Sequence, residues 1–151
     1  MNDMVQAIVR EITLRKNYLA GERVETIYFG GGTPSLLNSD QLQLLLNTIN
    51  ENFEVDADAE ITLESNPDDL TIELLQMLKS SGVNRLSIGI QSFREKDLLL
   101  MNRAHNAVQA LQCVSDAKAA GFENITIDLM YGLPELSSED WSENMKIAFG
   151  L

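Results

Sequence analysis

Residues 24–34, VETIYFGGGTP, decide the fold, because a short β-rich run ends there in three successive glycines. The β-branched and aromatic residues from 24 to 29 predict a strand, and the glycines at 30–32 end it. Glycine has no Cβ, so its backbone can approach a bound molecule closely. The stretch therefore predicts a strand whose carboxyl end opens into a loop that contacts a ligand. A tight turn between a strand and a helix is the structural alternative.

Strand and helix patterns alternate on both sides of this stretch. An apolar stripe from residue 4 to residue 18 or 19 predicts an opening helix that ends at Gly21, and Ser39 is expected to cap a helix that runs to about residue 52. Further strands are expected over residues 60–64, 85–90 and 124–130, and further helices over residues 71–80, 95–101, 108–120 and 137–149. Four strand-then-helix units predict an α/β fold with a parallel sheet, either a piece of an α/β barrel or a doubly wound sheet.

The composition limits the class of protein. A chain of 151 residues with 44% apolar content fits one domain, residues 1–151. Its 23 acidic and 11 basic residues give a net charge of -12, which argues against binding to nucleic acid. No apolar run is long enough to span a membrane, and the first residues lack the pattern of a signal peptide, so a cytoplasmic protein is expected.

Cysteine and histidine are each present once, as Cys113 and His105. A single cysteine forms no internal disulfide and holds no iron–sulfur cluster, which needs several thiolates. Cys113 falls on the apolar face of a predicted helix and is expected to be buried. The imidazole of His105 would suit proton transfer or contact with haem, and a hydrogen-bonded structural histidine is the alternative.

Polar side chains and glycines stand where each predicted strand ends. In a parallel α/β sheet the carboxyl ends of the strands meet at the edge where ligands bind. We therefore expect the strand-end residues to converge on one edge of the sheet. They are Gly31, Gly32 and Thr33 after the first strand, Glu64 after the second, Gln91 after the third, and Asp128 on the fourth.

The strand-end side chains have structural alternatives as well. The carboxylate of Glu64 suits a ribose or an ammonium group, or it caps the turn at Asn66. The amide of Gln91 can both donate to and accept from a ligand. Asp128 either contacts a ligand or is the buried partner of Arg103, whose planar guanidinium suits a carboxylate.

Five stretches, YFGGGTPSLL, LESNP, RLSIGIQSF, MNRAH and IDLMYGLP, resemble in order and spacing the motifs of a known family. This is the oxygen-independent coproporphyrinogen oxidase and haem chaperone family of radical S-adenosylmethionine (SAM) proteins. The resemblance covers nearly the whole chain, and the last three stretches are most similar to the haem chaperone branch. It implies a partial TIM-like barrel of which this chain is a middle piece, supplying the second to fifth strands.

The resemblance also implies a cofactor and the residues that bind it. Gly31, Gly32 and Thr33 would contact the methionine end of SAM, and Glu64 would bind SAM. Gln91, Arg103 and Asp128 would complete the cofactor pocket or a second ligand site. The family holds a [4Fe–4S] cluster on a CxxxCxxC motif that this sequence lacks, so no metal ligand is expected among these residues.

Porphyrin or haem is the partner that the resemblance implies for the intact protein. An oxidase would decarboxylate porphyrinogen propionates, whereas a chaperone would bind haem and deliver it; no catalytic residue is assigned. The alternative from another class is a non-radical α/β enzyme or cofactor-binding module that uses the GGGTP loop. Alone, the chain is expected to be inactive, to keep weak affinity for SAM and to self-associate through an open sheet edge.

Overall fold

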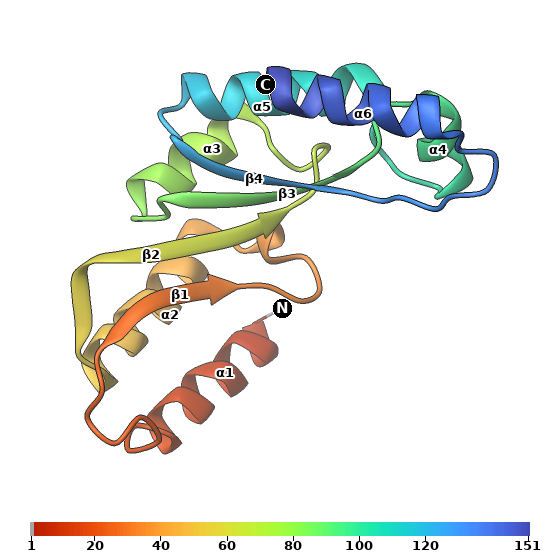
Figure 1. Cartoon of the computed structure of the whole chain (residues 1–151). Coiled ribbons are helices and arrows are strands. Elements are labelled where there is room, and N and C mark those ends of the chain that lie inside the picture. Colours follow the sequence, from red (N-terminus) through yellow and green to blue (C-terminus); the bar gives the residue numbers. More distant parts are fainter. Residues whose placement is uncertain (1) are drawn as a thin grey trace.

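Four parallel strands form one sheet whose strand order follows the chain, β1-β2-β3-β4 (Figure 1). The computed structural model describes residues 2–151. The strands are β1 Val24–Phe29, β2 Val55–Ser65, β3 Arg85–Gln91 and β4 Asn124–Leu129. The predicted α/β fold with four parallel strands is therefore confirmed.

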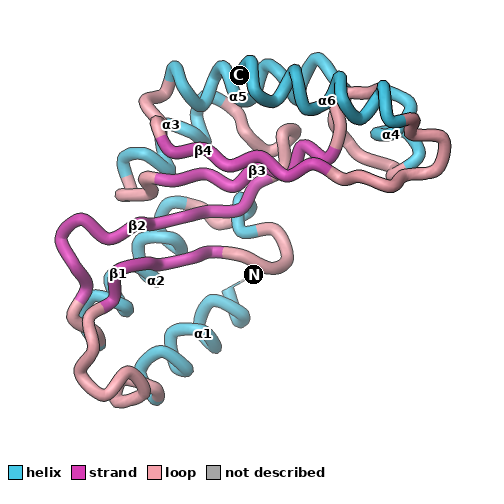
Figure 2. Tube along the Cα trace, viewed as in Figure 1, coloured by secondary structure: helices cyan, strands magenta, loops and turns pink. Residues whose placement is uncertain are grey.

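One helix precedes the first strand, and helices follow each of the four strands, as the tube in Figure 2 shows. They are α1 Asn2–Leu14, the 3-10 helix η1 Pro34–Leu36, α2 Ser39–Asn52, α3 Ile72–Ser80, α4 Glu95–Leu100, α5 Ala107–Ala119 and α6 Ser138–Gly150. Among the described residues, none of these helices has the length and apolar character needed to cross a membrane.

The core lies between the sheet and the helices. Leu63 of β2 and Leu86 and Ile88 of β3 are fully buried, and they pack in one cluster with buried residues of the helices. The helical members of this cluster include Leu42, Leu46, Leu75, Leu78, Ala110, Cys113 and Val114. Each buried leucine contributes about 1.5–3 kcal/mol through the hydrophobic effect.

The opposite face of the sheet is polar, because side chains alternate between the two faces along each strand. Glu64 of β2 is in register with Ser87 of β3, and Ser87 is in register with Thr126 of β4. Near the amino end of the sheet, Arg85 donates to Glu60 at 3.2 Å and to Thr126 at 2.7 Å. These bonds join three strands and fix their register on the polar face.

Most element boundaries agree with the sequence prediction to within one residue, and three of the differences have a physical explanation. The opening helix ends at Leu14, before residue 18, because Leu14 and Tyr18 are exposed and no burial stabilises a further turn. The cap of α2 is Asn38 rather than Ser39, since the Asn38 side chain accepts from the Gln41 N–H and completes a capping box.

The third difference is at β2, which begins at Val55 rather than at residue 60. The polar run VDADAE shows no strand pattern of its own. Pairing of Val55 with Val24 of β1 extends the strand, and a register shift follows between Val24 and Thr26.

Replacement of Leu86 by alanine should lower the free energy of unfolding by about 2–5 kcal/mol, because it leaves a cavity in the core. Leu99→Ala is the matched control, since Leu99 is 71% exposed and its loss should change stability by less than about 0.5 kcal/mol. Urea unfolding followed by circular dichroism measures both. Equal effects of the two substitutions would contradict the packing described.

Candidate functional site

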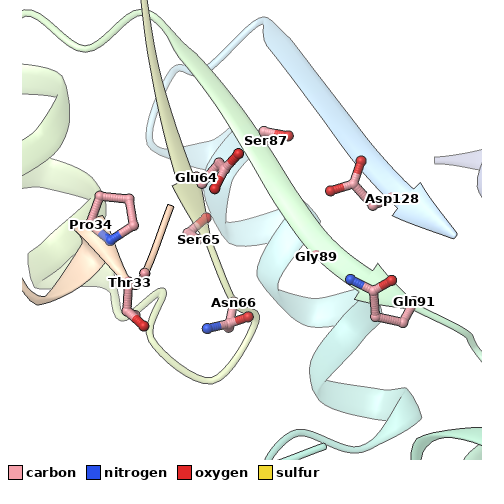
Figure 3. Close-up of a pocket in the computed structure, with 10 residues that line it drawn as sticks. Thr33, Pro34, Glu64, Ser65, Asn66, Ser87, Gly89, Gln91 and Asp128 are labelled. Carbon is pink, nitrogen blue, oxygen red and sulfur yellow. The ribbon is translucent and has the colours of Figure 1, made fainter. Parts of the chain in front are cut away.

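A cavity of about 190 Å³ opens at the carboxyl ends of the strands (Figure 3). Residues from all four strand ends meet there, although they are far apart in the sequence. The lining residues are Gly32, Thr33, Pro34, Glu64, Ser65, Asn66, Ser87, Gly89, Gln91 and Asp128. The expected convergence of the strand-end residues on one edge is therefore observed.

Two donors orient the carboxylate of Glu64. The Tyr28 hydroxyl donates to Oε1 at 2.8 Å, and the Gly31 backbone N–H donates to Oε2 at 3.0 Å. Each oxygen keeps a lone pair for another donor. The bond to Glu64 raises the pKa of Tyr28 above its ordinary value, so the phenol stays protonated at neutral pH and remains a donor.

The alternative in which Glu64 caps the following turn is not what the structure shows. Asn66 instead donates to the Asp69 carboxylate at 3.3 Å, and Asp69 also accepts from the Ser35 hydroxyl at 2.7 Å. The turn after β2 is therefore held by its own residues and by Ser35. The carboxylate of Glu64 faces the cavity.

The three glycines after β1 allow a left-handed backbone and leave space for the side chains of Tyr28 and Glu64. Gly31 and Gly32 both have φ of 75°, a left-handed conformation that other residues rarely adopt. A Cβ on Gly30 would lie 2.6 Å from the Tyr28 ring and 2.9 Å from Oε1 of Glu64. The loop therefore packs closely against the oriented Glu64 carboxylate. A simple turn between a strand and a helix would not require such close packing.

Gln91 ends β3 and reaches the cavity beside Gly89. A Cβ on Gly89 would lie 2.9 Å from the Gln91 side-chain nitrogen, so glycine leaves the space that this amide occupies. Arg103 donates through Nη2 to Asn66 Oδ1 at 2.8 Å and to the Gly89 carbonyl at 2.9 Å. Arg103 therefore lies beside the cavity and holds two of its lining residues.

Asp128 is not the buried partner of Arg103. It is exposed near the end of β4, and the described contacts of Arg103 go to Asn66 and Gly89 instead. The carboxylate of Asp128 lines the cavity opposite Glu64 (Figure 3). The two carboxylates, together with the Gln91 amide, give the site a negative, hydrogen-bonding character.

Neither Cys113 nor His105 is placed as a ligand for a metal or haem. Cys113 is buried in the core as expected, and burial raises the pKa of its thiol to about 12. His105 is buried too, with Nε2 3.0 Å from the Ile90 carbonyl, which agrees with the structural alternative. Within residues 2–151, no group of three or more His, Cys, Asp or Glu side chains is placed to hold a metal ion.

Sequence analysis missed Tyr28, Ser87 and Gly89. The sequence did contain a signal for these residues, because side chains alternate between the two faces of the sheet along each strand. Ser87, Gly89 and Gln91 are alternate residues of one strand and so share its polar face, and Tyr28 shares a face with Gly30. Counting back by two from each strand end would have found all three.

A parallel sheet covered by helices on its apolar face, with a polar cavity at its carboxyl edge, defines an α/β protein of the barrel type with a ligand site at the strand ends. Comparison with known proteins narrows this class. The model of the Radical SAM superfamily matches residues 4–148, and the chain belongs to that superfamily.

Curated relatives in two functional groups are similar to the chain. The heme chaperone HemW of Lactococcus lactis is 47% identical over 118 residues, which are 78% of this chain and 31% of that protein. The heme chaperone HemW of Escherichia coli is 37% identical over 150 residues, 99% of this chain and 40% of that protein. The oxygen-independent coproporphyrinogen III oxidase of Escherichia coli is 36% identical over 142 residues, which are 94% of this chain and 31% of that protein. The chain thus spans 31% to 40% of the length of these relatives.

Solved structures agree with the family. The coproporphyrinogen III oxidase HemN from Escherichia coli, described as a radical SAM enzyme, superposes with a TM-score of 0.86 at 35% identity. The match covers 97% of this chain and 34% of that one. The archaeal Elp3 of Methanocaldococcus infernus has a TM-score of 0.77 at 18% identity, which shows a shared fold alone.

The Cys113 thiol should resist alkylation by iodoacetamide at pH 8 while the chain is folded. Its pKa of about 12 leaves almost no thiolate, the reactive form, and burial blocks access. Mass spectrometry of the labelled chain checks this, with urea-unfolded chain at the same pH as the control. Rapid labelling of the folded chain would show that Cys113 is accessible and contradict its assignment to the core.

Proposed function

We propose that this chain forms the SAM-binding part of a radical SAM protein of haem or porphyrin metabolism. The observation that carries the proposal is the Glu64 carboxylate, which Tyr28 and Gly31 orient at the cavity without using up its acceptor capacity. Membership of the superfamily and the names of the relatives support it. We keep the cytoplasm, expected from the sequence, as the proposed location.

The donors and acceptors of the cavity suit the chemistry of SAM. SAM carries a positive sulfonium, an ammonium, a carboxylate and ribose hydroxyls. An oriented carboxylate such as Glu64 forms charge-assisted hydrogen bonds with an ammonium. The Gln91 amide can donate and accept, and the Asp128 carboxylate can accept from hydroxyls.

The proposed contacts follow from this match together with the family resemblance. Gly31, Gly32 and Thr33 would contact the methionine end of SAM, and Glu64 would bind its ammonium. Gln91, Asp128 and Arg103 would complete the pocket or a second ligand site. Because the cavity of about 190 Å³ is smaller than the roughly 300–1,000 Å³ of typical cofactor pockets, these residues would enclose only part of the ligand.

The residues present do not fit a [4Fe–4S] cluster. Cysteine thiolates hold such clusters, and the single cysteine of the chain is a buried thiol in the core. No step of the proposed function is therefore assigned to a cluster on these residues. The radical chemistry of the family belongs to its cofactors, and the proposed role of this chain is to bind and orient SAM.

Two activities are proposed for the whole protein. Haem delivery is favoured by the 47% identity to a heme chaperone, together with the MNRAH and IDLMYGLP stretches. Oxidative decarboxylation of a porphyrinogen is the second candidate, favoured by the TM-score of 0.86 to HemN. The parent protein, reconstituted anaerobically with iron and sulfide, distinguishes them in parallel assays of haem binding and coproporphyrinogen decarboxylation.

Glu64→Gln in the reconstituted parent protein should weaken SAM binding by about 1.5–3 kcal/mol, because a neutral amide replaces the charged acceptor. Isothermal titration calorimetry measures the change. Glu123→Gln is the control, since Glu123 is an exposed carboxylate before the amino end of β4. Unchanged SAM affinity of the Glu64→Gln protein, with iron content equal to wild type, would contradict the proposed role.

Gly30→Ala should also weaken SAM binding, although it removes no ligand contact. The new Cβ would meet Tyr28 and Glu64 at less than 3 Å and displace the carboxylate. Gly150→Ala is a matched control, because a Cβ there meets no atom within 4 Å. Wild-type affinity in the Gly30→Ala protein would show that the orientation of Glu64 is not required.

A further inference from the structure

The backbone at the end of β3 has an unusual conformation. Gln91 has φ of 70°, a value rare for a residue with a side chain. The Ser92 N–H donates to the Ile90 carbonyl at 2.9 Å, across Gln91. Gln91 is therefore the central residue of a γ-turn in its rare, positive-φ form, which is strained. Such strain persists only where the surrounding structure holds it, and it is concentrated at ligand sites.

The two carbonyls before Gln91 are held by one loop. Arg103 Nη2 donates to the Gly89 carbonyl at 2.9 Å, and His105 Nε2 lies 3.0 Å from the Ile90 carbonyl. A carbonyl can only accept, so Nε2 of His105 carries the hydrogen of this bond. Both donors belong to the MNRAH stretch, between α4 and α5.

His105 has no surface left for a ligand. Its side chain is 0% exposed, and Nδ1 faces the Asp68 carboxylate at 3.5 Å, which is longer than a normal hydrogen bond. Asp68 belongs to the loop after β2. The imidazole therefore lies between the end of β3 and this neighbouring loop, where it can act only through other residues.

The residues after Gln91 are fixed independently of His105. The Ser92 hydroxyl donates to Asp97 at 2.8 Å, and Asn144 of α6 accepts from the Phe93 N–H at 2.8 Å; both side chains are buried. The Gln91 carbonyl accepts from the Met130 N–H at 2.8 Å. Loss of His105 would thus release the upstream side of the turn while the downstream side stays anchored.

We infer that His105 is a positioning residue: by donating to the Ile90 carbonyl it holds the γ-turn that directs the Gln91 side chain into the cavity. Arg103 does the same for the Gly89 carbonyl. This inference goes beyond the contacts proposed for the ligand, and it relies on the proposed function only for the identity of that ligand as SAM. A histidine that merely fills the core would influence stability but not Gln91.

Two substitutions at His105 separate these roles. Glutamine keeps a side-chain N–H that can reach the Ile90 carbonyl, whereas methionine has a similar volume and no donor. Val114→Ala is the control for general destabilisation, because Val114 is a buried core residue of α5. All variants are made in the full-length parent protein, and their thermal midpoints are recorded.

Amide hydrogen exchange tests the turn without any ligand. In His105→Met the Ser92 amide should exchange faster than in wild type, because its acceptor, the Ile90 carbonyl, loses the bond to His105, whereas the Met130 amide, which donates to the Gln91 carbonyl on the anchored side, should keep its wild-type rate. In His105→Gln and Val114→Ala both amides should exchange at the wild-type rate, after correction for global stability. Wild-type exchange of the Ser92 amide in His105→Met would overturn the inference.

SAM titration of the reconstituted protein tests the consequence for the site. His105→Met should lose about tenfold in SAM affinity, as expected for one misplaced hydrogen-bonding group, whereas His105→Gln should stay within about threefold of wild type.

In a Gln91→Ala background, His105→Met should cause no further loss of SAM affinity, because the substitution acts through Gln91. Equal losses in both backgrounds would overturn the positioning role. Failure of the wild-type protein to bind SAM would instead contradict the proposed function, and the exchange experiment would still decide the inference.

Discussion

Burial of one face of the sheet against the helices is the constraint on which the cavity depends. Side chains alternate along each strand, so once Leu63, Leu86 and Ile88 pack into the core, Glu64 and Ser87 must lie on the opposite face. A slip of one residue would exchange the two sets and expose the core side chains. Burial of apolar side chains on one face therefore supplies the free energy that keeps the ligand-facing groups in place on the other, although none of those groups is apolar.

Two glutamates on the same strand show how the polar face is divided. Glu60, near the amino end of the sheet, is paired with Arg85 and also accepts from Asn124 at 3.1 Å. Glu64, at the carboxyl end, is held by Tyr28 and Gly31, both neutral donors. The charge of Glu60 is thus compensated within the sheet, whereas the charge of Glu64 is oriented without being compensated. An oriented carboxylate of this kind favours a cationic ligand, which agrees with the proposed binding of SAM.

Local sequence patterns were sufficient for the strands, most helices and the convergence of the strand ends. They depend on periodicity and on glycine, which act over a few residues. The patterns failed where distant partners decide the outcome. The polar start of β2 is a strand because it pairs with β1, and Arg103 contacts Asn66 and the Gly89 carbonyl rather than Asp128. No local rule gives such partners, because they depend on how the loops after β2 and β3 pack together.

The side chains that usually indicate chemistry have structural roles in this chain. The thiol of Cys113 belongs to the core, and the imidazole of His105 is committed to a backbone carbonyl. The cavity is lined by the glycine-rich loop, two carboxylates, and hydroxyl and amide side chains, which can bind and orient a ligand through hydrogen bonds. In a superfamily whose reactive species belongs to the cofactor, such a set is what the protein has to supply. The strained turn at Gln91 and the tightly packed glycines at 30 and 89 are then consistent with one requirement, namely the accurate placement of a few hydrogen-bonding groups around the ligand.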